Sequence, residues 1–229
     1  MKREIFETGD GSYSIKLPEW KENYHSKHGA IQEAKHVFIK SGLYFHQDNF
    51  QEKKNIKILE IGFGTGLNAL LTALYAEENK ISIHYTALEA YPVEEKEWKV
   101  LNFPKQLKTE KASLFYQKIN TAKWEGSVEI SKYFSIEKRK LFFQDYKEKQ
   151  VVDLIYFDAF GPRVQPELWE ENIFKNMFEA LGKKGVLVTY SAKGSVRRTL
   201  QKVGFTIEKI PGPPGKREML RAIKEKENS

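Results

Sequence analysis

The stretch "ILEIGFGTG", Ile58 to Gly66, decides the fold because it joins a buried strand to a helix through three closely spaced glycines. The segment 56–62, "IKILEIG", overlaps the start of this stretch and predicts a buried strand. From about Leu67 to Glu78, apolar residues recur at helical spacing. Glycines let a ligand approach the backbone closely, and the start of a helix offers unpaired N–H groups. The stretch therefore predicts a nucleotide-type site where the first core strand ends.

The spacing of the glycines narrows the class of nucleotide. Gly62, Gly64 and Gly66 form Gly-x-Gly-x-Gly, and Glu60 precedes the first glycine by two residues. Dinucleotide enzymes usually show Gly-x-Gly-x-x-Gly, and phosphate-binding NTPases need a Gly-Lys-Ser/Thr ending that this stretch lacks. The alternative interpretation is a tight turn beside ordinary surface acids.

Acidic residues follow the next strands at matching positions. Glu89 ends the second strand, "ISIHYTALEA", and a carboxylate there can accept both hydroxyls of a ribose. Asp145 follows "KLFFQ", which we expect to be the third strand, and is placed to contact an adenine amino group. Asp158 ends the strand in "VVDLIYFDAF". Because the carboxyl ends of parallel strands meet at one edge, these acids should lie beside the glycine loop.

Strand-length apolar runs alternate with helical segments from residue 56 onward, which predicts an α/β fold with a mostly parallel sheet. The loop "PGPPGK" separates two final strands, which we expect to pair antiparallel. We expect a single domain over 1–229. It consists of an N-terminal extension (1–54), a core (55–224) and, within the core, an insertion (104–138) before the third strand.

The charge and the residue composition of the chain limit the classes of partner and function that we expect. The net charge of +7 favours an anionic partner such as nucleic acid, although mixed Lys/Glu segments also simply solvate a surface. The chain has no cysteine, and its five histidines are not spaced as metal ligands, so we expect no metal. It has no apolar leader and no run near the roughly 18 apolar residues of a membrane span. We therefore expect a cytoplasmic protein without a membrane partner.

These features resemble the class I S-adenosylmethionine-dependent methyltransferases. The motif "EIGFGTG" is similar to their first motif and Glu89 to their second, over about residues 56–224. The resemblance implies a Rossmann-like, seven-stranded, mostly parallel sheet with an antiparallel last strand. It also implies bound S-adenosylmethionine, whose sulfonium makes its methyl group an electrophile. The cofactor-binding residues that it implies are Glu60, Gly62, Phe63, Gly64, Gly66, Asn68, Glu89 and Asp145.

Longer segments resemble one group within that class, the MnmC/MnmD-like tRNA methyltransferases of the wobble uridine. They are "GFGTGLN", the "DAFGP…PELW" run, "DGSYS", "EAKHVF" and "KREML". The resemblance implies methylation of the primary amine of 5-aminomethyl-(2-thio)uridine in the tRNA anticodon, giving the methylaminomethyl form. In many bacteria this domain is fused to a flavin-dependent oxidase that makes the aminomethyl group. Here we expect a stand-alone form, with a separate enzyme supplying that substrate.

The segment after the central strand carries the expected catalytic residue. The carboxylate of Asp158 can orient an ammonium group and accept its proton, although it could also only cap the following loop. The family often reads Asp-Gly-Phe-Ala-Pro where this chain has "DAFGP", a swap of the small residues. Asp158, Phe160 and Pro162 still match. Phe160 either stacks on the target uracil, which must be splayed out of the anticodon, or packs within its loop.

Four further residues are candidates for substrate binding. Lys216 and Arg217 precede the last strand and are placed to contact tRNA phosphates or the wobble nucleotide, unless they only solvate the surface. Glu33 and His36 match the early family segment and are candidates for closing the cofactor pocket. A lone histidine is more often structural.

Two other functions fit the same motifs. One is a small-molecule amine methyltransferase of this fold, for which the basic C-terminal third is incidental. The other is a catalytically silent S-adenosylmethionine-binding module that docks on RNA or protein. The presence of Glu60, Glu89 and Asp158 beside the glycine loop argues against the silent module.

Overall fold

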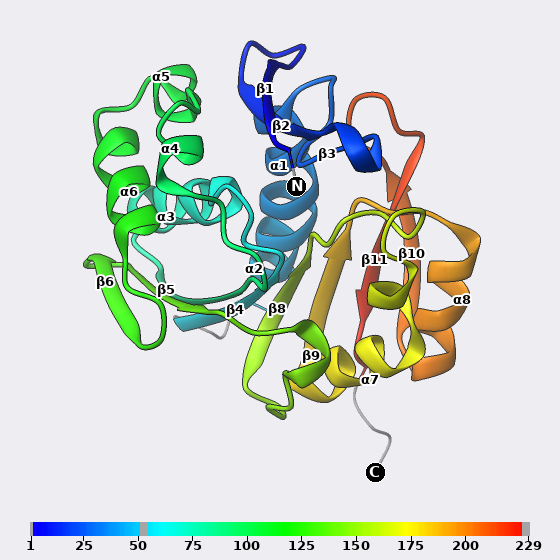
Figure 1. Cartoon of the computed structure of the whole chain (residues 1–229). Coiled ribbons are helices and arrows are strands. Elements are labelled where there is room, and N and C mark those ends of the chain that lie inside the picture. The colour runs from blue at the N-terminus through cyan, green and yellow to red at the C-terminus, as the bar shows by residue number, and fades with distance from the viewer. Residues whose placement is uncertain (1, 51–54, 226–229) are drawn as a thin grey trace.

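The computed structural model of this chain describes residues 2–50 and 55–225. Its main sheet consists of β4 (Asn55–Ile61), β5 (Ser82–Leu88), β6 (Ser127–Ser131), β7 (Phe134–Arg139), β8 (Val152–Phe157), β9 (Leu181–Thr189), β10 (Thr206–Pro211) and β11 (Glu218–Ile223). Over the described residues the strand order is β10-β11-β9-β8-β4-β5-β7-β6 (Figure 1). Five neighbouring strands in this order run parallel to one another, namely β9, β8, β4, β5 and β7. The mostly parallel sheet predicted from the sequence is thereby confirmed.

The edges of the sheet are antiparallel. β11 pairs antiparallel with both β9 and β10, so the last strand has the expected direction. At the other edge, β6 pairs antiparallel with β7 and forms a hairpin with it. The main sheet therefore has eight strands over the described residues rather than the predicted seven, because this hairpin adds an edge strand.

The third core strand is β7, and the prediction that "KLFFQ" forms it is wrong. β7 alternates buried and half-buried residues and pairs in parallel with β5 along its length. The insertion predicted over 104–138 is therefore wrong at its C-terminal end, where it includes most of this strand. Asp145 lies instead in the 3-10 helix η3 (Phe143–Asp145). The apolar residues Leu141 and Phe143 pack into a hydrophobic cluster on one face of the sheet and do not join it.

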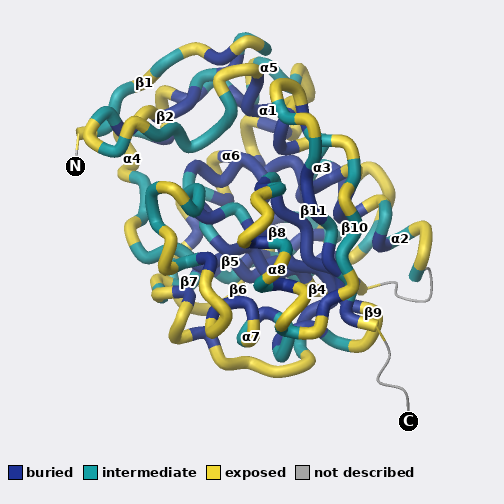
Figure 2. Tube along the Cα trace, turned by 90° about the vertical axis from the view of Figure 1, so that its right-hand side faces the viewer, coloured by how far each residue is buried: buried dark blue, intermediate teal, exposed yellow. Residues whose placement is uncertain are grey.

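Helices cover both faces of the sheet. They are α1 (Ala30–Ala34), η2 (Lys35–Tyr44), α2 (Phe45–Asn49), α3 (Leu67–Asn79), α4 (Glu95–Trp98), α5 (Phe103–Leu107), α6 (Glu110–Thr121), α7 (Glu171–Ala180) and α8 (Gly194–Val203). One hydrophobic cluster joins α1, η2, α3 and α6 to the sheet, and a second joins α7 and α8 to it. Figure 2 shows the central strands, such as β4, β5 and β8, as mostly buried and the outer segments as more exposed. β8, in the middle of the parallel strands, is buried along its whole length because both of its faces are covered.

Helices α1, η2 and α2 form one continuous helical segment that crosses the sheet. The η2 part is π-helical, and the residues at its junctions with α1 and α2 keep helical backbone angles. Gly42 makes this packing close, since a Cβ atom there would lie 2.9 Å from Cγ2 of Val188. The segment thereby fixes the position of Glu33, which lies near its beginning.

Residues before this helix form a small separate sheet of β1 (Glu4–Glu7), β2 (Tyr13–Leu17) and β3 (Glu22–Asn23), with the 3-10 helix η1 (Pro18–Trp20) between β2 and β3. Asp10, from the early "DGSYS" segment, connects this sheet to α1, because its carboxylate accepts a hydrogen bond of 2.9 Å from the N–H of Gln32. The predicted boundary between extension and core falls at 54/55, and residues 51–54 lie outside the described residues.

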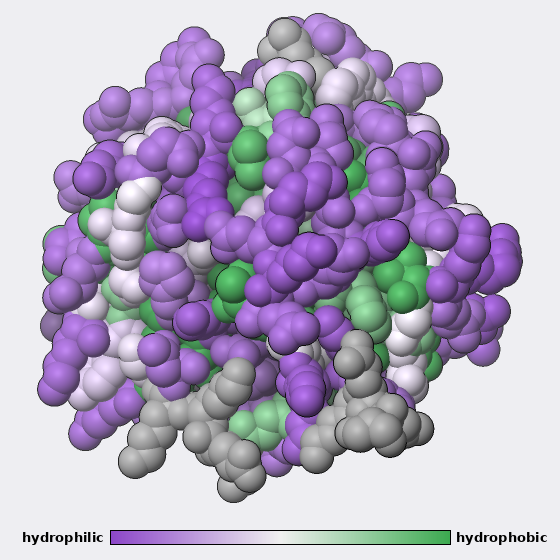
Figure 3. Space-filling view, turned by 90° about the horizontal axis from the view of Figure 1, so that it is seen from below, coloured by the Kyte–Doolittle hydropathy of each residue, from purple (hydrophilic) through white to green (hydrophobic). Residues whose placement is uncertain are grey.

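The two ends of the sheet differ. The carboxyl ends of the parallel strands point toward the small N-terminal sheet (Figure 1). Seen from below, the opposite side of the molecule is mostly hydrophilic, with small separate apolar patches (Figure 3). Within residues 2–50 and 55–225, no helix is both long and apolar enough to cross a membrane.

Candidate active site

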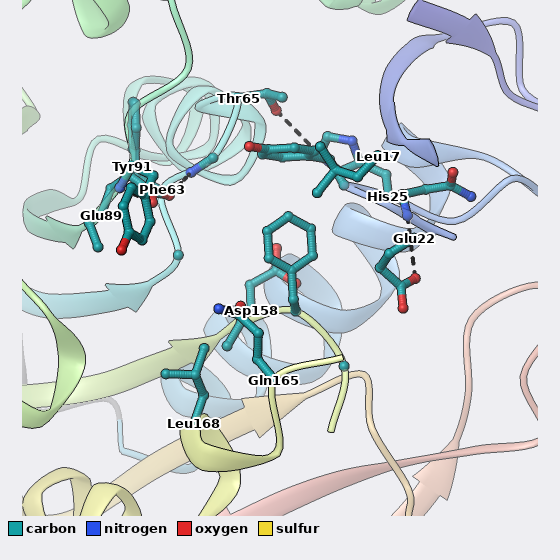
Figure 4. Close-up of a pocket in the computed structure, with 18 of the residues that line it drawn as sticks. Leu17, Glu22, His25, Phe63, Thr65, Glu89, Tyr91, Asp158, Gln165 and Leu168 are labelled. Atoms are coloured by element: carbon teal, nitrogen blue, oxygen red, sulfur yellow. Dashed lines mark hydrogen bonds between the residues drawn. The ribbon is translucent and has the colours of Figure 1, made fainter. Parts of the chain in front are cut away.

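A cavity of about 1210 Å³ lies between the carboxyl edge of the main sheet and the N-terminal sheet. β4 pairs with β5 on one side and with β8 on the other, so the connections diverge here and leave a crevice. The glycine loop follows β4, and Asp158 follows β8. Figure 4 shows Asp158 between Phe63, Glu89 and Tyr91 on one side and Leu17, Glu22 and His25 on the other.

The glycine loop has a backbone that other residues adopt only with strain. Gly62, Gly64 and Gly66 have φ angles of 93°, 50° and 77°. A Cβ atom on Gly62 would lie 2.8 Å from the carbonyl oxygen of Asp158, and one on Gly64 would lie 3.2 Å from Cδ1 of Tyr24. The glycines are therefore required both by the turn and by the close approach of the opposite wall.

Glu89 is held against this loop by backbone donors. Its Oε2 accepts a hydrogen bond of 3.0 Å from the N–H of Gly64, and its Oε1 accepts one of 2.9 Å from the N–H of Tyr91. A carboxylate has about four acceptor positions. Two of them are used here, which leaves two for the hydroxyls of a ribose.

A buried polar network connects the two halves of the crevice. The side-chain amide of Asn68, at the start of α3, donates a hydrogen bond of 2.9 Å to Oε1 of Glu60 and one of 2.8 Å to Oδ2 of Asp158. Glu60 is fully buried, and its Oε2 finds no hydrogen-bond partner among the residues that the structure describes. Burial raises the pKa of Glu60 well above its ordinary value, and the nearby charge of Asp158 raises it further. Glu60 therefore lies behind the loop and positions Asn68.

Asp158 has the environment of a base. Burial raises its pKa well above the ordinary value, and the negative charge of Glu33 adds to this effect. The hydrogen bond from Asn68 and the charge of Lys216 act in the opposite direction but are smaller. An aspartate with a raised pKa binds a proton more tightly than an exposed one does. The geometry therefore places a proton acceptor at the carboxyl end of β8, inside the cavity.

Three aromatic rings form the wall of the cavity opposite the sheet. The ring of Phe160 makes edge contacts with Tyr24, at 5.0 Å between centroids, and with Trp20, at 5.8 Å. The carbonyl oxygen of Phe160 accepts a hydrogen bond of 2.7 Å from the indole N–H of Trp169. The position of Phe160 is thereby fixed from both sides, with its ring facing the N-terminal segment.

His25 links the N-terminal sheet to the glycine loop. Its Nδ1 lies 2.8 Å from the Ser14 hydroxyl, and its Nε2 lies 3.3 Å from the Thr65 hydroxyl. Burial lowers the pKa of His25 to about 4. The ring is therefore neutral at physiological pH and acts through hydrogen bonds.

The structure brings most of the candidate residues together. Those that line the cavity are Gly62, Phe63, Gly64, Asn68, Glu89, Asp158, Phe160, Glu33 and Lys216. Gly66 begins α3 behind the loop, beside Phe63. Within the described part of the chain, we find no group of histidine and acidic side chains that could hold a metal ion.

Besides Glu60 and Gly66, which lie behind the loop, three further candidates lie outside the lining of the cavity. Asp145 is exposed in η3, and its neighbour Gln144 lines the cavity in its place. His36 lies 2.8 Å from the carbonyl oxygen of Pro211, which fastens the helix to the hairpin loop. Arg217 is exposed next to Lys216. The structure therefore does not bring these three predicted residues into the lining of the cavity.

Sequence reasoning missed the N-terminal wall and one residue of the sheet edge. Arg3, Trp20, Tyr24 and His25 line the cavity but precede the first core strand, where no periodic pattern marked them. Tyr190 also lines it. It directly follows β9, so its strand-end position was a signal equivalent to that of Glu89 and Asp158.

The cavity fits the S-adenosylmethionine that the sequence motif implies. Gly62 and Gly64 line the cavity, and Glu89 retains acceptor positions beyond the two that the N–H groups of Gly64 and Tyr91 use. Tyr91 and Phe142, two exposed aromatic rings 6.0 Å apart at the same end of the cavity, offer apolar faces to an adenine.

Two curated relatives are similar to this chain in sequence. One relative, the tRNA 5-methylaminomethyl-2-thiouridine biosynthesis bifunctional protein MnmC of Leptospira interrogans (strain Fiocruz L1-130), is 31% identical over 210 residues, which are 86% of this chain and 32% of the relative. The protein with the same name from Vibrio campbellii is 26% identical over 213 residues, with the same two shares of coverage. This chain therefore spans about a third of the length of these curated relatives.

Solved structures share the fold. The crystal structure of MNMC2 from Aquifex aeolicus superposes with a TM-score of 0.78 at 26% identity, over 96% of this chain and 69% of that one. Spermidine synthase from Thermotoga maritima gives a TM-score of 0.58 at 15% identity, over 99% and 70% of the chains, which shows a common fold alone. A family model described as S-adenosyl-L-methionine-dependent methyltransferase matches residues 109–225. Because this model covers half of a chain that also has the fold and the glycine loop, the protein belongs to the S-adenosyl-L-methionine-dependent methyltransferase family.

Proposed function

We propose that this enzyme methylates the primary amine of 5-aminomethyl-(2-thio)uridine at the wobble position of tRNA, giving 5-methylaminomethyl-(2-thio)uridine. The observation that carries the proposal is the position of Asp158, a half-buried carboxylate with a raised pKa beside the cofactor loop. The names of the MnmC relatives support the substrate.

The charge of the cavity supports an amine as the methyl acceptor. The chain as a whole has a net charge of +7. In contrast, the described residues that line the cavity include seven carboxylic side chains and five lysine or arginine side chains. A cavity with excess negative charge attracts a cation. The acceptor therefore arrives as an ammonium ion and has to lose a proton before it can react.

We assign that proton to Asp158. S-adenosylmethionine supplies an electrophilic methyl group on a positively charged sulfur. An amine with a pKa near 10 is mostly protonated in water, and an ordinary aspartate, with a pKa of about 3.9, is a weak base toward it. Burial raises the pKa of Asp158, which reduces this mismatch. Asp158 orients the ammonium, accepts its proton and leaves a lone pair directed at the methyl carbon. The nitrogen–carbon bond then forms as the sulfur–carbon bond breaks.

The remaining site residues bind and orient the two substrates. We assign the ribose of the cofactor to Glu89, and its backbone contacts to Gly62, Phe63 and Gly64. Asn68 holds Asp158 in position, with Glu60 behind it. Phe160 lies with Trp20 and Tyr24 on the wall where a splayed uracil ring can stack.

This function also implies a setting and partners. tRNA modification places the enzyme in the cytoplasm, with the anticodon loop as its partner. Another catalytic centre has to supply the aminomethyl group, since the chemistry proposed here only methylates an existing amine.

The test uses a synthetic anticodon stem-loop with 5-aminomethyluridine at the wobble position. The chain is incubated with this RNA and S-adenosylmethionine, and the digested nucleosides are analysed by mass spectrometry. We expect one added methyl group on the modified uridine and none on a matched stem-loop with uridine. We also expect the KM for RNA to rise with salt, because phosphate contacts weaken. Equal kcat/KM for the free nucleoside 5-aminomethyluridine, without a salt effect, would contradict the tRNA proposal in favour of a small-molecule amine.

A further inference from the structure

The ammonium group of Lys216 occupies a cage made by two other segments of the chain. Its Nζ lies 2.8 Å from Oε1 of Glu33 and 3.9 Å from the centroid of the Tyr190 ring. Glu33 is on α1, Tyr190 follows β9, and Lys216 is in the loop between β10 and β11. A carboxylate and the face of an aromatic ring are the two groups that bind an alkylammonium ion best in a partly buried site.

The two walls of the cage are held without help from Lys216. Oε2 of Glu33 accepts a hydrogen bond of 2.7 Å from the N–H of Ser26, and the residue is only 8% exposed. The hydroxyl of Tyr190 donates a hydrogen bond of 2.9 Å to the carbonyl oxygen of Ala159. The walls are therefore preorganised, and Oε1 of Glu33 remains directed at whatever cation occupies the cage.

The cage adjoins the residue that we assign as the base. The charges of Glu33 and Lys216 both act on Asp158, and Asp158 in turn acts on Tyr190. All four residues line the same cavity. The hydrogen bond from Tyr190 to Ala159 also fixes the residue that follows Asp158. A cation in the cage is thus held beside the group that accepts a proton.

Lys216, in contrast to the walls, is able to withdraw. Its side chain is 35% exposed, against 11% for that of Glu33, and it belongs to the loop "PGPPGK" at the tip of the hairpin. An empty cage would leave the buried carboxylate of Glu33 without a cation, with only the N–H of Ser26 as a hydrogen-bond partner, which is costly. A cation that arrives from outside can replace Lys216 at little cost, whereas a neutral group cannot.

We propose that Glu33 and the face of Tyr190 bind the primary ammonium group of the methyl acceptor, and that Lys216 fills this site as an internal substitute until the acceptor displaces it. The proposal rests on the function proposed above and adds to it the residues that select an amine. Lys216 is then a competitor of the acceptor and not a contact for it.

The experiment measures binding of the nucleoside 5-aminomethyluridine by titration calorimetry in the presence of S-adenosylhomocysteine, with 5-methyluridine as the uncharged control. Because a nucleoside has no phosphate, this probe isolates the ammonium group. We expect Lys216→Met to tighten binding of 5-aminomethyluridine by about tenfold, the size of one displaced cation–aromatic contact, and to leave 5-methyluridine unchanged. We expect Glu33→Gln and Tyr190→Leu each to weaken it by about tenfold or more.

Arg217→Met is the matched control, because it removes the neighbouring exposed cation that does not line the cavity. It should not tighten nucleoside binding. Unchanged affinity for S-adenosylhomocysteine shows that each variant is folded. Binding of 5-aminomethyluridine that is weaker or unchanged in Lys216→Met would overturn the proposal, because Lys216 would then assist the acceptor or not meet it.

The two proposals fail separately. If the wild type does not methylate the modified stem-loop but the nucleoside affinities follow the expected order, the tRNA function is wrong and the ammonium site remains. If the stem-loop is methylated while Lys216→Met does not tighten binding, the ammonium site is wrong and the function remains.

Discussion

The cofactor half of the cavity consists mainly of backbone from one short segment, whereas the acceptor half consists of side chains from five separate segments. Residues 62–66 and Glu89 form the first half through φ angles and N–H groups. The second half needs Trp20 to Ser26, Glu33, Asp158 to Phe160, and Tyr190 with Lys216. The first half follows from local sequence, and the second exists only when the whole chain is folded. A substitution should therefore damage one half while sparing the other.

Among these substitutions, we expect Asp158→Asn to separate the loss of turnover from the loss of cofactor affinity most strongly. The asparagine still accepts a hydrogen bond from Asn68 but cannot take a proton, so turnover should fall by about a thousandfold. The dissociation constant of S-adenosylmethionine, measured by calorimetry, should change by less than about threefold, since the cofactor half is intact. Equal losses in turnover and in cofactor affinity would place Asp158 in the cofactor half and contradict the proposed mechanism.

Gly64→Ala should have the opposite effect. The φ angle of 50° and the contact of 3.2 Å with Tyr24 both oppose a Cβ atom, so cofactor affinity should fall by about a hundredfold. Gly126→Ala is the matched control, because Gly126 has a φ angle of 94° in an exposed turn away from the cavity. It should lose a similar amount of stability in urea denaturation but keep its cofactor affinity. Equal affinities of the two variants would refute a direct role of the glycine loop.

His25 joins the two halves of the cavity, and we expect its titration to change the free energy of unfolding with pH. Burial lowers its pKa to about 4, so between pH 6.5 and 4 the unfolded chain binds a proton that the folded chain does not. Stability therefore falls as the pH decreases through this window, by about 2 kcal/mol at pH 4.5. His25→Gln should remove this part of the acid sensitivity in urea denaturation, whereas His28→Gln, at an exposed position, should not. Identical pH slopes for wild type and His25→Gln would contradict this assignment.

The smallest expected effect is a shift in the pH at which kcat falls on the acid side of its pH profile, the acid limb. The groups that face Asp158 are Glu33, Lys216 and, through Asn68, Glu60. Activity should fall as Asp158 becomes protonated, at a higher pH than for an exposed aspartate, because its pKa is raised. Lys216→Met removes a charge that lowers this pKa and should move the limb to higher pH. Glu33→Gln should move it to lower pH. Shifts in the same direction in both variants would show that another group controls the limb.

The sequence by itself determined the cofactor half of the cavity, which depends on the backbone conformation of neighbouring residues. A strand, glycines that tolerate positive φ angles and a following helix are local features, and the residues that they pointed to, Gly62, Gly64 and Glu89, line the cavity. The ends of parallel strands meet at one edge, so Asp158 could also be placed. Asp145 does not lie at a strand end, because "KLFFQ" has the composition of a strand but packs on a face of the sheet, and β7 takes the strand position.

Only the tertiary structure decided what faces the acceptor. Side-chain contacts between Glu33, Tyr190 and Lys216 depend on how a helix, a strand end and a hairpin loop pack, and no spacing in the sequence records those distances. His36 and Arg217 illustrate this, since each is close in sequence to a cavity residue and points elsewhere. Backbone conformation is set largely by neighbouring residues, whereas the meeting of distant side chains is set by the burial of the whole core.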